Sequence, residues 1–125
     1  ISFREVGATL ASRWGSYIPD SHALIFVIDI SDMGALSSSR ILLHEILSNQ
    51  HLIYTNKHPI AIILNKSDSI DTMTKNIAMN LLRLDELYNL LYNTEYNRGI
   101  QIYSGHCLNA LLSREILEWV ATVCC

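Results

Sequence analysis

The sequence has few cysteines and no long apolar run, and both shortages restrict the class of protein. Its three cysteines, Cys107, Cys124 and Cys125, are irregularly spaced, which argues against a disulfide framework and favours a reducing compartment. The longest strongly apolar run, 23–30, is interrupted by Asp29 and is far too short to span a bilayer. No signal peptide is visible. We therefore expect a cytoplasmic domain.

Clusters of like charge are also missing. The net charge is −3 at pH 7 and no block of one sign occurs, which argues against a broad nucleic-acid or membrane-surface footprint. Half of the 125 residues are hydrophobic, which argues against disorder. The length suits a single domain with a real core. Because the chain begins with Ile1 and enters a strand-like segment at once, we expect it to be a fragment.

Apolar patterns predict alternating strands and helices. The predicted strands cover 1–5, 23–30, 59–64 and 99–104. The predicted helical segments are 9–18 (a loop or short helix closed by Pro19), 35–49, 72–93 with a break near 83–85, and 110–123. Asp32 is a candidate cap for the helix at 35–49. This order predicts an α/β fold with a parallel sheet covered by helices on both faces. Ligands of such sheets bind at the carboxyl ends of the strands, where we expect Gly7, Asp29, Asn65 and Ser104.

Three polar residues directly follow the strand expected over 59–64, namely Asn65, Lys66 and Asp68. The carboxylate of Asp68 can accept hydrogen bonds from both the ring N–H and the exocyclic amine of guanine. Adenine lacks that donor pair and would leave the carboxylate unpaired. Lys66 can lay its alkyl stem on the purine face, and Asn65 can tie this loop to a neighbouring one. The motif therefore predicts guanine recognition, although the same residue types are common in ordinary loops.

Two other loops are candidates, and each on its own is better explained by an ordinary turn. Glu5 and Gly7 end the first expected strand, where an acid can hold Mg²⁺ through water and a glycine N–H can face a terminal phosphate. Ser104 and Gly105 follow the strand at 99–104, where small residues can offer a backbone N–H to a base carbonyl. The functional interpretation of both loops is therefore favoured only in combination with the guanine motif.

The remaining reactive side chains form no site. His106 and Cys107 have no second Cys or His at ligand spacing, which argues against a metal site or a nucleophile. Cys124 and Cys125 follow the last helix without a flexible basic tail, which argues against lipidation. We therefore expect no catalytic residue and no confident metal ligand in this chain.

The order of these motifs resembles that of a Ras-superfamily GTPase from its third nucleotide motif onward. The segments REVG, ALIFVIDISD, PIAIILNKSD and IQIYSG follow one another, and a helix with Trp119 comes last. The Trp14 and Tyr17 pair ahead of the FVID strand is similar to the Arf and Arf-like branch. REVG stands where typical Arf proteins have W-D-x-G-G-Q, as in a divergent Arf-like member. The resemblance covers essentially the whole chain.

The resemblance implies a P-loop NTPase fold of the small-GTPase type, of which residues 1–125 would be a single partial domain. It implies guanine binding by Asn65, Lys66, Asp68, Ser104 and Gly105. It also implies that GTP or GDP and Mg²⁺ bind the complete protein, with Glu5 and Gly7 near the magnesium and terminal phosphate. Effector and regulator proteins would be its partners, and membrane contact would come only through a missing amino-terminal part.

Three departures from the family pattern limit this interpretation. Glu5 replaces the usual Asp, which affects the expected magnesium geometry. Ala8 and Thr9 stand in place of Gly and the water-positioning Gln, and without that Gln intrinsic hydrolysis should be very slow. No G-x-x-x-x-G-K-[ST] loop occurs, nor the Thr loop that helps to bind magnesium. The missing first strand would lie between the strands at 1–5 and 23–30 and leave two apolar edges uncovered. We expect this stretch alone to fold poorly and to bind nucleotide weakly.

Three alternative interpretations of the sequence remain. A pseudo-GTPase or scaffold would keep the fold without turnover, and Ala8 and Thr9 favour it. A β-subunit type of signal-recognition-particle receptor would have a transmembrane segment upstream. An unrelated flavodoxin-like domain would carry the Asn-Lys-x-Asp motif by accident.

Overall fold

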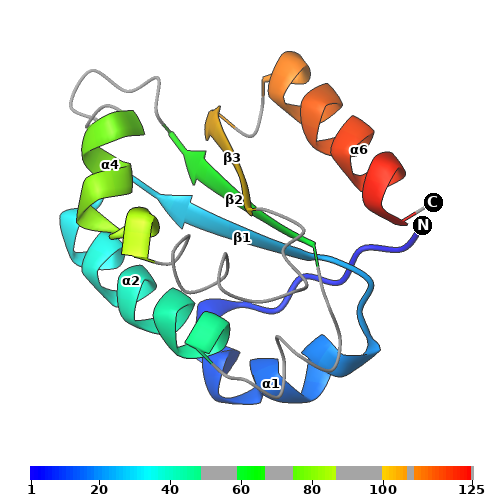
Figure 1. Cartoon of the computed structure of the whole chain (residues 1–125), viewed down its shortest axis with the longest axis horizontal. Helices are drawn as coiled ribbons and strands as arrows, with labels where there is room; N and C mark the ends of the chain where they lie inside the picture. Colours follow the sequence, from blue (N-terminus) through cyan, green and yellow to red (C-terminus); the bar gives the residue numbers. More distant parts are fainter. Residues whose placement is uncertain (49–58, 67–74, 87–99, 107–108, 125) are drawn as a thin grey trace.

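A parallel sheet of three strands forms the centre of the molecule (Figure 1). The computed structural model describes residues 1–48, 59–66, 75–86, 100–106 and 109–124. Strands β1 (Leu24–Asp29), β2 (Ile60–Asn65) and β3 (Ile100–Gly105) lie in the order β1-β2-β3, and both pairings are parallel. Each strand lies within one residue of its predicted range. The expected α/β fold with a parallel sheet is therefore confirmed.

The middle strand is the most deeply buried part of the sheet. All residues from Ile60 to Leu64 are buried, as the apolar run IAIIL predicts for a strand covered on both faces. Side chains alternate along it: Ile60, Ile62 and Leu64 join one core, and Ala61 joins the other. Because both neighbours of β2 are strands, its backbone is paired on either side.

Helices cover both faces of the sheet, as predicted (Figure 1). Helices α2 (Met33–Ser48) and α4 (Lys75–Leu81) lie on one face, where Leu36, Leu43 and Leu82 pack with Ile62 and Leu64 in the larger core. Helix α6 (Ala110–Cys124) lies on the other face and buries Leu112, Trp119 and Val120. This second core also contains the half-buried side chains of Ile25 and Tyr103.

The break predicted near 83–85 lies at Arg83. This residue has a left-handed φ of 51° and lies two residues after the end of α4 at Leu81. A left-handed residue at the end of a helix is a common way to stop it. A further helical turn covers 84–86. The outer parts of the expected helix, 72–74 and 87–93, lie outside the described residues.

The prediction of a strand over 1–5 is wrong. Residues 1–7 have no regular secondary structure, and the sheet of the described residues has no ladder that includes them. An alternating sequence forms a strand only where a neighbouring strand pairs with its backbone, and this segment is held by side chains instead. The indole Nε1 of Trp14 donates a hydrogen bond of 3.3 Å to the Gly7 carbonyl, and the Arg4 guanidinium lies 5.4 Å from the ring centre of Tyr17.

Short helical turns connect this segment to the sheet. The 3₁₀ turn η1 (Ala8–Arg13), helix α1 (Trp14–Tyr17) and the 3₁₀ turn η2 (Ile18–Asp20) follow one another, and they match the loop or short helix expected here. Pro19 lies in the first positions of η2, where a missing N–H costs no hydrogen bond. Ile18 is the only buried residue of the three turns.

An open groove of about 1210 Å³ runs beside β1. Residues 1–8 line it together with Leu24, Ile25, Phe26 and Val27 of the strand. Strand β1 is an edge of the described sheet, and Val27 is 53% exposed although it lies within the strand. Of the two uncovered apolar edges expected from the sequence, the described sheet has one, at β1, and the other depended on the strand at 1–5 that is not observed. None of the helices described here is long and apolar enough to cross a membrane.

Candidate guanine-base site

The carboxyl ends of the three strands bring polar residues together at one edge. The parallel register aligns Asp29 with Asn65, and Asn65 with Gly105. The Ile30 N–H donates to the Asn65 carbonyl over 3.2 Å and so holds the chain of β1 against β2 just beyond the strand. The predicted placement of Asp29, Asn65 and Ser104 at this edge is therefore confirmed, because the sheet is parallel and their strands end together.

Gly7, which we expected at the same edge, does not end a strand. It lies before η1 with an extended backbone (φ −63°, ψ 158°). Glu5 and Gly7 are among the residues that line the groove, whose lining on β1 is Leu24 to Val27. Their placement depends on a strand that the structure lacks, which is why the expectation for Gly7 was wrong.

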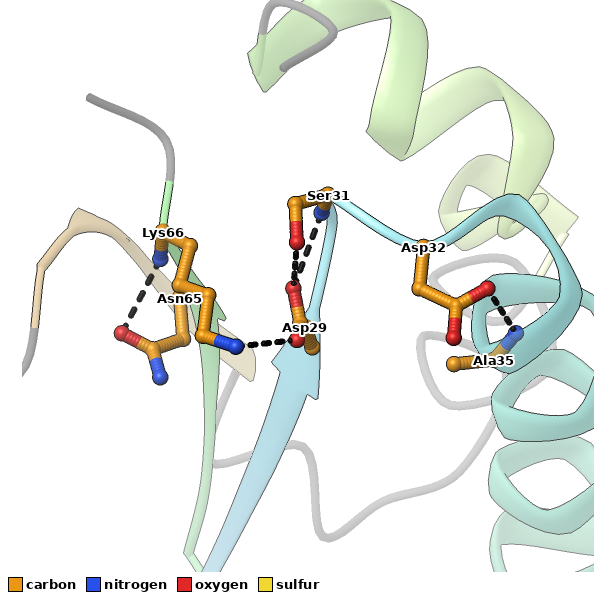
Figure 2. Close-up of polar contacts among 6 residues, drawn as sticks. All are labelled: Asp29, Ser31, Asp32, Ala35, Asn65 and Lys66. Carbon is orange, nitrogen blue, oxygen red and sulfur yellow. Dashed lines mark hydrogen bonds and ion pairs between the residues drawn. The ribbon is translucent and has the colours of Figure 1, made fainter. Parts of the chain in front are cut away.

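An ion pair connects the ends of β1 and β2 (Figure 2). The Lys66 Nζ lies 2.7 Å from Oδ2 of Asp29. The other carboxylate oxygen, Oδ1, accepts hydrogen bonds from the Ser31 N–H (2.9 Å) and the Ser31 hydroxyl (2.5 Å). The hydrogen bond from Lys66, followed by those from Ser31, lowers the pKa of Asp29 to about 2. The same contact raises the pKa of Lys66, so both groups are charged at neutral pH.

Backbone geometry turns Lys66 toward β1. Its φ is 62°, in the left-handed region that few residues other than glycine adopt. The Asn65 Oδ1 accepts a hydrogen bond of 2.9 Å from the Lys66 N–H, which fixes the amide of Asn65 at the turn. Figure 2 shows the Lys66 side chain extending from the end of β2 to the carboxylate of Asp29 at the end of β1.

Asp32 caps the helix that follows β1, as the sequence predicted. Its Oδ1 accepts hydrogen bonds from the N–H groups of Gly34 (2.9 Å) and Ala35 (3.2 Å), at the start of α2. These N–H groups have no partner within the helix, so the carboxylate satisfies them and interacts favourably with the helix dipole. Asp32 is therefore directed toward α2 and not toward Lys66 (Figure 2).

The loop after β3 lies beside the same edge. Ser104 is exposed and pairs in register with Leu64, and Gly105 is half-buried. Gly105 has a φ of 157°, and a Cβ at this position would lie 3.2 Å from Cδ2 of Leu112 at the start of α6. The Asn109 N–H donates to the His106 carbonyl over 2.8 Å, and Asn109 Oδ1 accepts from the Leu111 N–H. A small residue at 105 thus lets the loop pass close to α6.

Asp68, the predicted guanine discriminator, lies outside the described residues, and so does Cys107. For magnesium, the described part of the chain contains no group of three His, Cys, Asp or Glu side chains that could hold a metal ion. Glu5 is an exposed single acid, and it does not by itself make a magnesium site. Of the predicted site residues, the structure thus describes Asn65, Lys66, Ser104 and Gly105 at the ends of β2 and β3, and Glu5 and Gly7 in the segment before η1.

Sequence reasoning placed Asp29 at the edge but gave it no function, and it overlooked Ser31. The available signal was an acid that interrupts an apolar strand run and is followed by Ser-Asp. A charged residue at the end of a buried strand needs a partner, and the parallel register supplies Lys66.

The fold and this edge define a class: an α/β domain whose ligand site lies at the carboxyl ends of parallel strands. The model of the ADP-ribosylation factor family matches residues 5–124. The chain therefore belongs to the ADP-ribosylation factor family, and the expected small-GTPase fold class and Arf-like branch are confirmed.

Individual relatives agree with this family. The chain is 32% identical over 87 residues to human ADP-ribosylation factor-like protein 16, a match covering 70% of this chain and 43% of that protein. It is 26% identical over 113 residues to ADP-ribosylation factor-like protein alp41 of Schizosaccharomyces pombe, covering 90% and 55%. It is 32% identical over 62 residues to ADP-ribosylation factor-like protein 13B of Chlamydomonas reinhardtii, covering 50% and 11%. The chain thus spans about half the length of alp41 and less of the other two.

Proposed function

We propose that this chain is the base-recognising part of an Arf-like guanine-nucleotide switch, which binds GTP and GDP. The observation that carries the proposal is the Asn65-Lys66 turn at the end of β2, held against Asp29 of β1 at the ligand edge of the sheet. Asp68 follows two residues later and completes the Asn-Lys-x-Asp motif. Its carboxylate would accept the two N–H donors of guanine, and Ser104 and Gly105 would offer backbone N–H to the base carbonyl.

The phosphates and Mg²⁺ would be bound mainly by residues upstream of Ile1. In P-loop NTPases a G-x-x-x-x-G-K-[ST] loop cradles the phosphates, and this sequence has none. From this chain, Glu5 and Gly7 would contribute to the Mg²⁺ and terminal-phosphate end only once an upstream strand pairs with their segment and brings it to the carboxyl end of the sheet. Sequencing about 60–70 residues upstream of Ile1, the expected length of such a part, tests this arrangement. An upstream Met preceded by a stop codon, with no such loop between it and Ile1, would overturn it.

Hydrolysis by this switch would be very slow or absent. Ala8 and Thr9 open η1 directly after Gly7, at the positions where the family pattern has Gly and the water-positioning Gln. Neither side chain can orient an attacking water as an amide does. The same observation favours the second candidate function, a pseudo-GTPase or scaffold that acts through protein partners. Single-turnover hydrolysis by the full-length protein distinguishes the slow GTPase switch from the pseudo-GTPase or scaffold, because measurable turnover excludes the latter.

A measurement of base preference tests whether Asp68 recognises guanine. In the full-length protein, Asp68→Asn replaces an acceptor pair by an amide, and it should shift the preference from guanosine toward xanthosine nucleotides. Asp32→Asn is the matched control, because it removes the same charge nearby while keeping a good helix cap. Unchanged affinity and base preference in Asp68→Asn would show that the guanine assignment is wrong. A transmembrane segment upstream would favour the signal-recognition-particle receptor type.

A further inference from the structure

We propose that Asp29 positions Lys66 for the nucleotide base, and that Ser31 in turn positions Asp29. This inference rests on the proposed function, because the base is the ligand that the two residues would prepare for. It assigns a role in binding to the end of β1, which lies outside the Asn-Lys-x-Asp and Ser-Gly motifs. Asp29 and Ser31 act through Lys66 and are positioning residues that do not need to touch the nucleotide.

The Lys66 side chain is fixed at both of its ends. Its backbone is left-handed, which directs the side chain across the edge, and its Nζ lies 2.7 Å from Asp29 Oδ2. The four methylene groups therefore extend from the end of β2 to the end of β1 (Figure 2). Because the ammonium is paired with Asp29, the methylene groups of Lys66 present an apolar surface and the charge lies at the Asp29 end of the side chain.

The Asp29 carboxylate is itself oriented, one oxygen for each neighbour. Oδ1 accepts both the N–H and the hydroxyl of Ser31, and Oδ2 accepts the Lys66 ammonium. The two Ser31 bonds hold the carboxylate plane with Oδ2 directed at β2. Without Ser31 Oγ one of the two bonds remains, so the orientation should be weakened and not lost.

Fold stability does not account for this arrangement. The side chains of Lys66 and Asp29 are 47% and 33% exposed, and ion pairs this accessible contribute little to stability. A left-handed lysine also costs backbone energy. A free lysine side chain has high conformational entropy, which must be lost when a ligand packs on it. Holding the stem in advance removes that cost from nucleotide binding.

The flat face of a purine can pack against this apolar surface of Lys66. The stem is exposed, it lies at the edge where Asn65 and Gly105 also end their strands, and it carries no polar atom. A heterocycle can pack its face against these methylene groups. The face of the base is the same in guanine and xanthine, so Asp29 should affect affinity without changing base preference.

The test measures the affinity of the full-length protein for a fluorescent GDP analogue in six forms: wild type, Asp29→Asn, Lys66→Met, the double variant, Ser31→Ala and Asp32→Asn. Asp29→Asn should weaken binding by roughly 5- to 20-fold, the size expected for one lost charged hydrogen bond at a partly exposed site, mainly through faster release. It should have no further effect in the Lys66→Met background. Asp32→Asn should bind like wild type, and Ser31→Ala should lie between wild type and Asp29→Asn.

Each outcome separates this inference from the function on which it rests. If the wild type does not bind the analogue, the proposed function fails and the inference fails with it. If the wild type binds and Asp29→Asn binds equally well, the inference alone is overturned. Equal losses from Asp29→Asn with and without Lys66 would also overturn it, because Asp29 would then act independently of Lys66. Circular dichroism and thermal unfolding identify a variant that has lost its fold. If Asp29→Asn does not fold, Asp29→Glu replaces it in the test. Because Asp29→Glu keeps the charge but moves it, it should keep part of the wild-type affinity, and affinity equal to that of wild type would overturn the inference.

Discussion

The ring of Trp14 meets the ring of Phe26 edge-on, with centroids 5.5 Å apart and planes at 89°. The same indole donates a hydrogen bond to the Gly7 carbonyl, so one side chain connects the amino-terminal segment to β1. Aromatic pairs in this geometry contribute about 0.5–1.5 kcal/mol beyond the area that they bury. Trp14 thus links a segment without regular structure to the edge of the sheet.

Removing this link should release the segment. In Trp14→Ala we expect residues 1–7 to become more sensitive to a protease that cuts after Arg4, because both the ring contact and the hydrogen bond are lost. Trp14→Phe keeps an aromatic contact and should be intermediate. Cleavage followed by mass spectrometry measures the rate. Equal cleavage of all three proteins would mean that Trp14 does not hold the segment.

The Asp32 cap gives a second prediction. Asp32→Ala leaves the N–H groups of Gly34 and Ala35 without their acceptor, and we expect the free energy of unfolding to fall by about 0.5–2 kcal/mol. Asp32→Asn keeps an acceptor oxygen, so its loss should be only a few tenths of a kcal/mol. Urea denaturation followed by circular dichroism makes the comparison. A loss in Asp32→Asn as large as that in Asp32→Ala would assign the effect to charge and not to the cap.

The sheet and its helices could be predicted because their signals are local. The apolar runs at 23–30 and 59–64 coincide with β1 and β2 within one residue, and the helix expected over 35–49 is observed over Met33–Ser48. The strand over 1–5 could not be judged in this way. Its alternation resembles that of a strand, but a strand also needs a partner for its backbone, and this partner cannot be read from the segment itself.

The candidate site could be predicted only in part. The Asn-Lys-x-Asp motif marked Asn65 and Lys66, and the parallel topology placed them at the ligand edge. The pairing of Lys66 with Asp29 joins residues 37 positions apart and depends on strand register and on a left-handed φ at Lys66. Neither property is visible in residue types alone. The guanine contact of Asp68 stays a prediction.

Core packing gives a third prediction, with a control on the same helix. Leu43 is 1% exposed in the larger core, and Ile41, two positions earlier on α2, is 64% exposed. We expect Leu43→Ala to lower the free energy of unfolding by about 2–5 kcal/mol, because it removes apolar contacts and leaves a cavity. Ile41→Ala should change it by no more than about 0.5 kcal/mol. Urea titration measures both, and similar losses would show that α2 packs on the sheet in another orientation.

The Asp29–Lys66 pair gives a pH-dependent prediction. The pKa of Asp29 is lowered from 3.8 to about 2 in the folded chain, first by Lys66 and then by Ser31. Between these two values the folded state binds fewer protons than the unfolded state. The interaction therefore makes a stabilising contribution above pH 3.8, which is small because both side chains are partly exposed, and this contribution is lost as the pH falls toward 2. The titration midpoint of the Asp29 carboxyl carbon, measured by NMR, should rise in Lys66→Met but stay below 3.8, because the Ser31 bonds remain. Arg83→Met, which breaks the remote pair with Glu86, is the control and should leave the midpoint unchanged. A midpoint unaffected by Lys66→Met would mean that the two side chains are not paired in solution.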